Sequence, residues 1–361
     1  MTIPNSVTNI GREAFYSCTD LNGVTIPNSV TGIGSSSFEE SGLTNVTIPS
    51  SVTSILLGGF ADCTSLTAIN AAANNPAFTS FGGVLFNQNQ TTLVQYPGGL
   101  RGSYTISNSV TDIGGDAFYG CRGLTSVIIP DSVTTIEGTA FYACIGLTNV
   151  LFGNALNSLG EAAFENCTAL ISLTIPNSLT NIPQAAFAGC TSMVSVTIPN
   201  SVTSIGAEAF ENCPSLTNVT IPGSVTNIGG DAFFACKNLA GAFFTGNAPA
   251  PDATAFFEDA ATTVYYLPGT TNWGSTYGDV ATALWNPSIS IWDGHFGVIA
   301  NQFGFDINGT VNIPIVVEAS TNLPGSNWIP VESCSLTNGL IRFSDPQWSN
   351  YPARFYQIGA P

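Results

Sequence analysis

Phenylalanine and cysteine recur along the chain with a period of 23 residues, which is the strongest pattern in the sequence. Each of these cysteines follows its phenylalanine by three positions. The pairs are Phe118/Cys121, Phe141/Cys144, Phe164/Cys167, Phe187/Cys190, Phe210/Cys213 and Phe233/Cys236. The frame extends to Phe15/Cys18, Phe60/Cys63, Phe38 with Ser41, and a last copy with Phe256 and Asp259. This period predicts a solenoid, in which each turn buries its apolar side chains only against neighbouring turns.

Within one copy, residues 216–236, two hydrophobic patterns follow each other. Val219 and Ile221 face one side and Thr220 the other, which predicts a short strand that ends at Pro222. The following Gly-x-x-Ala-Phe-x-x-Cys-x-x-Leu stretch spaces its apolar residues by three or one, as in a short helix or 3-10 turn. Acidic residues at its start suit a helix N-terminus. They are Glu13, Asp116, Glu208 and Asp231.

Two segments depart from the repeat. Between Cys63 and Cys121 about 35 residues are extra, and the runs 81–86 and 91–96 around a polar turn predict a β-hairpin. This hairpin is either a modified, protruding turn of the solenoid or a contact element. From about residue 288, alternating runs at 303–307 and 311–317 flank Asn308-Gly309, which predicts a hairpin within a small β-sandwich.

The predicted fold is therefore a repeat β-solenoid with a small all-β C-terminal domain. A parallel sheet should cover one face of the solenoid, and short helical or 3-10 turns the other. The expected organisation has repeats at 1–69, a β-hairpin insert at 70–107, repeats at 108–268, a cap or linker at 269–287, and a β-sandwich-like module at 288–361.

The repeats resemble the BspA-like, Treponema-type leucine-rich repeat family, whose units read much like Val-Thr-Ile-Pro-Asn-Ser-Val-Thr-Ser-Ile-Gly-x-x-Ala-Phe-x-x-Cys. The resemblance covers roughly residues 1–268. The Val-Glu-Ala-Ser-Thr-Asn-Leu and Phe-Ser-Asp-Pro-Gln-Trp stretches are similar to all-β modules of secreted bacterial repeat proteins. The resemblance implies a bacterial or protist surface protein that adheres to host or matrix proteins, or that interacts with other cells.

Charge narrows the classes of partner. The net charge is −17, and the six basic residues are scattered along the chain. Because phosphate and anionic lipid surfaces bind clustered Lys and Arg, nucleic acid and membrane surfaces are excluded as partners. No apolar run is long enough for a membrane span. The chain opens in the middle of a repeat, so either a leader and a half-repeat have been truncated, which we favour, or the protein starts with an uncapped turn. We expect an extracellular or cell-surface protein.

Eight of the nine cysteines share one repeat position, and Cys334 stands alone. Adjacent turns would place the repeated sulfurs in a row, so disulfides are one reading. The other reading, which we favour, is a row of buried thiols that act as small hydrophobes. Cys334 is likewise expected to be buried. No Cys-x-x-Cys pair accompanies them, and His295 is the single histidine, so we predict no metal site, no cofactor and no catalytic centre.

The outward positions of the strands are the candidate binding residues. They are Ile128, Leu151, Thr174, Thr197, Thr220, Phe243 and Tyr266. Apolar patches favour protein contact, and polar rows with aromatic residues suit glycans. Alternatively, threonine is simply common in parallel strands. The sequence thus predicts a non-enzymatic scaffold that binds protein or glycan through its sheet face. The alternative is a structural protein that forms dimers or filaments through an uncapped N-terminal turn.

Overall fold

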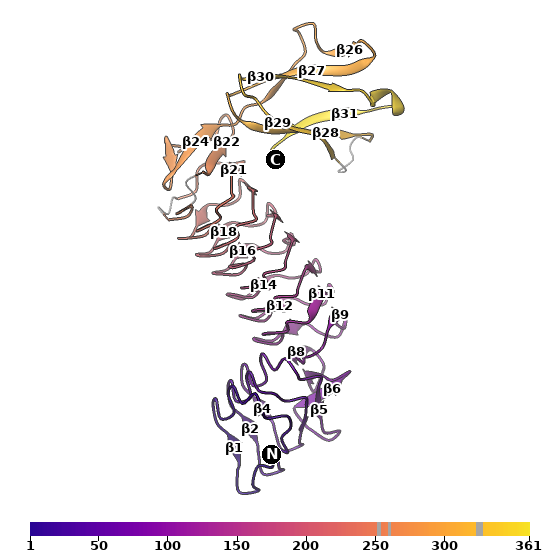
Figure 1. Ribbon diagram of the computed structural model, residues 1–361, viewed down its shortest axis with the longest axis vertical. Coiled ribbons are helices and arrows are strands. Elements are labelled where there is room, and N and C mark those ends of the chain that lie inside the picture. Colours follow the sequence, from indigo (N-terminus) through magenta and orange to yellow (C-terminus); the bar gives the residue numbers. More distant parts are fainter. Residues whose placement is uncertain (251–253, 259–260, 323–327) are drawn as a thin grey trace.

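The computed structural model describes residues 1–250, 254–258, 261–322 and 328–361. The chain stacks its repeats into an elongated solenoid, and a second β-structure follows at the C-terminal end (Figure 1). Equivalent residues of successive turns pair in parallel, as Val127 does with Val150 and Ile113 with Ile136. The predicted fold class, a solenoid of parallel strands with a small all-β C-terminal domain, is therefore confirmed.

The strands of the solenoid lie in two rows. The main row contains β3 (Asn45–Ile48), β5 (Ala68–Ala71), β9 (Gly102–Thr105), β11 (Leu124–Ile128), β13 (Asn149–Leu151), β15 (Ser172–Thr174), β17 (Ser195–Thr197), β19 (Asn218–Ile221), β21 (Gly241–Phe244), β22 (Thr263–Tyr266) and β24 (Val280–Leu284). The side row contains β1 (Asn9–Ile10), β2 (Gly32–Ile33), β4 (Ser54–Ile55), β8 (Thr92–Gln95), β10 (Asp112–Ile113), β12 (Thr135–Ile136), β14 (Ser158–Leu159), β16 (Asn181–Ile182), β18 (Ser204–Ile205) and β20 (Asn227–Ile228). The outward side of the main row is called the strand face below.

The Ala-Phe-x-x-Cys segments are not helical, so this part of the prediction is wrong. The residue before Ala-Phe and the residue before Cys adopt the left-handed conformation in turn after turn, for example Asp116 at φ 57° and Ala143 at φ 54°. A right-handed helix excludes such residues. The Phe118 N–H instead donates to the Ala140 carbonyl of the next turn, at 2.7 Å. Because these N–H groups bond across turns, the segment forms consecutive β-turns, and its acidic residues do not mark a helix N-terminus.

The phenylalanines and cysteines of the repeat form the centre of the core. Neighbouring phenylalanine rings stack with centroids 4.5 Å apart for Phe118 and Phe141, and 5.7 Å apart for Phe164 and Phe187. The cysteines of this row are free thiols. The prediction of buried thiols is confirmed from Cys63 to Cys236, whereas the equivalent Cys18 is exposed. Asp259, expected in the last cysteine place, lies outside the described residues.

Residues 78–99 form a modified turn of the solenoid. The strands β6 (Phe78–Phe81) and β7 (Val84–Asn87) are antiparallel, and β8 pairs antiparallel with β7 but parallel with β10. Tyr96 takes the phenylalanine place and stacks on Phe118 at 4.9 Å. The buried core divides here into an N-terminal cluster that includes Phe60 and a C-terminal cluster that begins with this turn. The ring stack is therefore interrupted at the modified turn.

The C-terminal domain, residues 288–361, contains two antiparallel sheets. One sheet consists of β25 (Ser288–Ser290), β26 (Gly297–Ile299), β27 (Gln302–Asn308) and β30 (Leu340–Asp345), and the other of β28 (Pro314–Ser320), β29 (Ile329–Ser335) and β31 (Phe355–Gly359). Before this domain, β23 (Thr276–Tyr277) pairs antiparallel with β24.

The only helix in the described residues is η1 (Trp348–Asn350). Nothing in the described part of the chain is a helix long and apolar enough to cross a membrane. Cys334 is partly exposed, not buried as predicted.

Candidate binding surfaces

The strand face presents uncharged side chains over five consecutive turns, from β11 to β19. Ile128 pairs with Leu151, and Thr174 pairs with Thr197 on the following strands. Thr220 continues this row, and all five side chains are exposed to solvent. Their neighbours in the strands are serine, threonine and asparagine. A partner that binds here displaces water without removing it from any charged group of this surface, which lowers the desolvation cost of binding.

Two more exposed aliphatic side chains lie just before strands of this face. Ile171 and Val194 occupy equivalent positions just before β15 and β17, and the Val194 N–H donates to the Ile171 carbonyl at 2.8 Å. Both side chains are exposed, as are those of Ile128 and Leu151. Neither Ile171 nor Val194 was predicted from the sequence, because both stand outside the strict alternation of the strand. Exposed aliphatic residues therefore occur on four consecutive turns, with Ile128 and Leu151 inside their strands and Ile171 and Val194 just before theirs.

Phe243 and Tyr266 are not part of an exposed patch, which corrects the prediction for both. Phe243 does point outward from the solenoid, but only 3% of its surface is accessible. The residue next to it on the following strand is Tyr265, not Tyr266, because the repeat shortens here by one residue. Tyr266 instead stacks on Trp273 with ring centroids 5.2 Å apart.

The C-terminal domain covers this end of the strand face. Phe243 and Tyr265 share one hydrophobic cluster with Phe305, Ile315 and Phe343 of the two antiparallel sheets. The Trp285 indole N–H, just after β24, donates to the Pro314 carbonyl at 2.9 Å. The open strand face therefore ends at Thr220.

A hollow on the strand face lies over the first turns. It has a volume of about 640 Å³ and polar walls, among them Thr25, Asn28, Asn45 and Thr47. Thr25 and Thr47 are the outward residues of their turns. They occupy the same repeat position as the exposed residues from Ile128 to Thr220. The amide and hydroxyl groups of this hollow can form hydrogen bonds with a ligand but carry no charge.

Acidic residues gather on the Ala-Phe-x-x-Cys turns instead. Burial raises the pKa of Glu39, Asp116, Glu165 and Glu211. Where the modified turn interrupts the stack, Arg122 forms a 2.6 Å ion pair with Asp62. These two residues line a cavity of about 460 Å³ together with Glu40 and Arg101. The negative charge of the solenoid is therefore concentrated away from the strand face.

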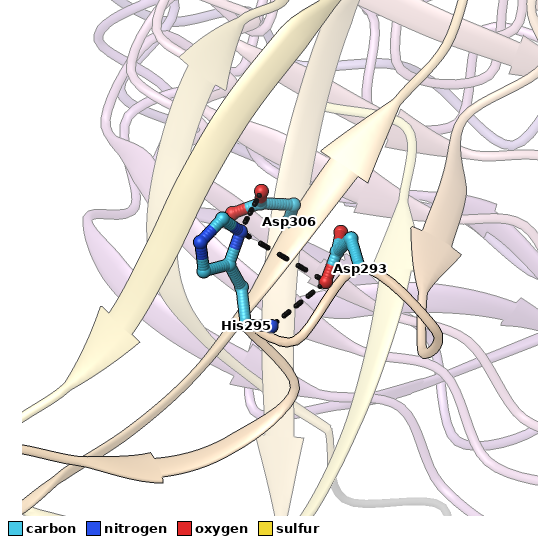
Figure 2. Close-up of side chains that lie close together, drawn as sticks. All are labelled: Asp293, His295 and Asp306. Carbon is cyan, nitrogen blue, oxygen red and sulfur yellow. Dashed lines mark hydrogen bonds and ion pairs between the residues drawn. The ribbon is translucent and has the colours of Figure 1, made fainter.

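A cluster of histidine and aspartate side chains lies in the C-terminal domain (Figure 2). The His295 Nδ1 atom is 2.9 Å from Asp306 Oδ2 and 3.9 Å from Asp293 Oδ1. Arg342 Nε donates to the other Asp306 oxygen at 2.8 Å. The hydrogen bonds from Arg342 and His295 hold the pKa of Asp306 below its usual range. The sequence singles out His295 as the one histidine but does not reveal this cluster, because Asp306 comes from a separate strand, β27.

The solenoid is similar to known leucine-rich repeat proteins. The family model for the BspA type leucine rich repeat region matches residues 1–110, 111–240 and 166–272. Among solved structures, a leucine rich cell surface protein of Faecalibacterium prausnitzii A2-165 is 32% identical, with a TM-score of 0.53. That match covers 68% of this chain and 59% of the other, so this chain spans less than two thirds of that protein.

Two further structures share the fold. A leucine-rich repeat protein of Eubacterium ventriosum is 28% identical over 65% of this chain and 75% of its own, with a TM-score of 0.54. The pneumococcal vaccine antigen PcpA is 18% identical over 74% of each chain, with a TM-score of 0.51, and this likeness shows the fold alone. No curated protein matches the sequence.

Proposed function

The chain belongs to the family of BspA-type leucine-rich repeat proteins, and on that premise we propose that it is a non-catalytic binding scaffold at the cell surface. Its ligand is a protein, bound through the strand face between β11 and β19. The observation that carries the proposal is a set of exposed aliphatic side chains in, or just before, the strands of an otherwise polar, uncharged face. This set consists of Ile128, Leu151, Ile171 and Val194.

The composition of this face is that of a protein interface. Such interfaces combine an apolar centre, depleted of charge, with a polar rim that carries the hydrogen bonds. Here the polar side chains of Asn149, Thr174 and Thr197 are exposed in strands β13, β15 and β17. Rigid stacking of the turns holds these groups in place before binding, so that little conformational entropy is lost on association.

The experiment compares the full chain with variants on arrays of extracellular proteins and of glycans. We expect the wild type to bind at least one protein, and Leu151→Ser combined with Val194→Ser to weaken that binding about ten-fold or more, as expected when central apolar contacts are removed. Ile145→Ser is the matched control, because Ile145 is an exposed aliphatic residue on a turn outside the strand face.

Retained binding by the double variant, or binding to glycans only, would contradict the proposal. Light scattering of the same samples gives the mass in solution. A mass that rises with concentration and is unchanged by the double variant would favour self-association through another surface.

A further inference from the structure

Asp293, His295 and Asp306 bring three metal-ligand atoms together in the C-terminal domain, on its sheet of β25, β26, β27 and β30 (Figure 2). One oxygen of each aspartate and a ring nitrogen of the histidine all lie within 4.8 Å of one another. Ligand atoms around a zinc ion are separated by about 3 to 3.5 Å, given metal–ligand distances near 2.1 Å. The observed 2.9 Å between His295 and Asp306 is close to this range, whereas the 3.9 Å between His295 and Asp293 requires the Asp293 carboxylate to move closer when an ion binds.

Strand pairing and a backbone hydrogen bond hold the three side chains in position. Asp306 is buried in the middle of β27, where it is paired with Ser290 on one side and Arg342 on the other. Asp293 and His295 belong to the short loop between β25 and β26. The His295 backbone N–H donates to Asp293 Oδ1 at 2.9 Å, so one hydrogen bond fixes the two loop ligands relative to each other.

Arg342 is compatible with a metal ion. It binds Asp306 Oδ1, whereas the oxygen that faces the histidine is Oδ2. The carboxylate can therefore keep Arg342 as an orienting partner on one oxygen and use the other for the ion, as outer partners commonly do. With neutral histidine, the two aspartates and Arg342 sum to a charge of −1, in a chain of net charge −17. The local charge and the net charge of the chain are both negative, so both favour the binding of a cation.

We propose that Asp293, His295 and Asp306 form a binding site for a transition-metal dication of the zinc type. One imidazole and two carboxylates suit zinc and its neighbours, whereas calcium and magnesium prefer oxygen ligands throughout. His295 is half-exposed, with 45% of its side chain accessible. The site is therefore open to solvent, which leaves room for water or a ligand group of a partner to complete the coordination.

The test is a titration of the chelator-treated full chain with Zn²⁺, followed by calorimetry and by NMR of the histidine ring. Because the chain has one histidine, its ring resonances report on this site alone. The exposed Cys18 and the partly exposed Cys334 also attract zinc, so all proteins carry Cys18→Ser and Cys334→Ser. We expect one zinc ion per chain and a saturable shift of the ring resonances.

His295→Ala and Asp293→Asn should each weaken zinc binding by about ten-fold or more. Glu332→Gln is the matched control, since it removes one negative charge from β29 of the same domain without touching the cluster; it should change the affinity less than about two-fold. Circular dichroism of the metal-free variants verifies folding. Ring resonances that do not respond to zinc, or equal affinities of His295→Ala and the parent protein, would overturn the proposal.

Discussion

The Cys144 thiol donates a 3.0 Å hydrogen bond to the Phe118 carbonyl of the preceding turn. The same carbonyl accepts the backbone N–H of Cys121 in its own turn. The contact repeats along the stack, for example from Cys167 to Phe141 at 3.2 Å. The cysteine of the repeat therefore fills space in the core, and its thiol also forms a hydrogen bond to the neighbouring turn.

Replacement of Cys144 by alanine should destabilise the solenoid. The change leaves a small cavity and removes a buried hydrogen bond, so we expect a loss of about 1 to 2 kcal/mol in the free energy of unfolding. Denaturant unfolding measures it. Cys18→Ala is the control, because Cys18 is exposed, and it should change stability by less than about 0.5 kcal/mol. Equal losses in both variants would contradict this role for the buried thiol.

Thiol reactivity should separate the nine cysteines into two groups. Cys18 is exposed and Cys334 partly exposed, whereas the remaining cysteines are buried. Burial raises the pKa of Cys63 to about 11 and that of Cys190 to about 12, which suppresses the reactive thiolate. We expect a thiol reagent to label Cys18 and Cys334 in the native protein, and the others only after unfolding. Peptide mass spectrometry identifies the labelled residues. Rapid labelling of Cys190 in the native protein would contradict the prediction that the repeat cysteines are buried.

Sequence periodicity predicts the solenoid because each turn repeats the same local environment. Phe118 and Phe141 must stack once their turns do, and spacing alone reveals this. The left-handed conformation of Asp116 is not visible in the sequence, since it depends on backbone hydrogen bonds to the next turn. Apolar spacing by three suits a helix and a series of β-turns equally, so the pattern did not distinguish them.

The binding residues were harder to predict, for a different physical reason. An outward position on a strand is exposed only if nothing else folds over it. Phe243 has the same place in its turn as Thr220, yet the C-terminal domain covers it. The cluster of Asp293, His295 and Asp306 likewise depends on the pairing of strands in that domain. Such contacts between separate segments leave no periodic signal in a single sequence.

Mild acidification should stabilise the solenoid. Burial raises the pKa of Glu39, Asp116, Glu165 and Glu211, so the native state binds protons more readily than the unfolded chain. Stability then increases as pH falls through the raised native values towards the ordinary glutamate value of 4.5. Asp306 has a lowered pKa and loses its stabilising effect only at more acidic pH. A thermal melting temperature that falls between pH 7 and pH 5.5 would contradict this prediction, and Glu165→Gln should reduce the pH dependence.

The contact of Phe243 with the C-terminal domain should control how firmly that domain is docked. Phe243 and Tyr265 stack at 4.8 Å, and 3% and 8% of their surfaces remain accessible. Phe243→Ser removes this ring from a shared core, so about 3 kcal/mol of stabilisation should be lost at the junction. Calorimetry should then show the C-terminal domain melting separately and earlier, and small-angle scattering should show a longer maximum dimension.

Thr197→Ser is the control for this change, because Thr197 has the equivalent outward position on the open strand face. It should leave both measurements as in the wild type, since its side chain contacts no second domain. If Phe243→Ser melts as the wild type does and keeps its dimensions, then the hydrogen bond from Trp285 to Pro314 and the remaining contacts hold the junction without the ring. The aromatic pair would in that case fill the interface but contribute little to its strength.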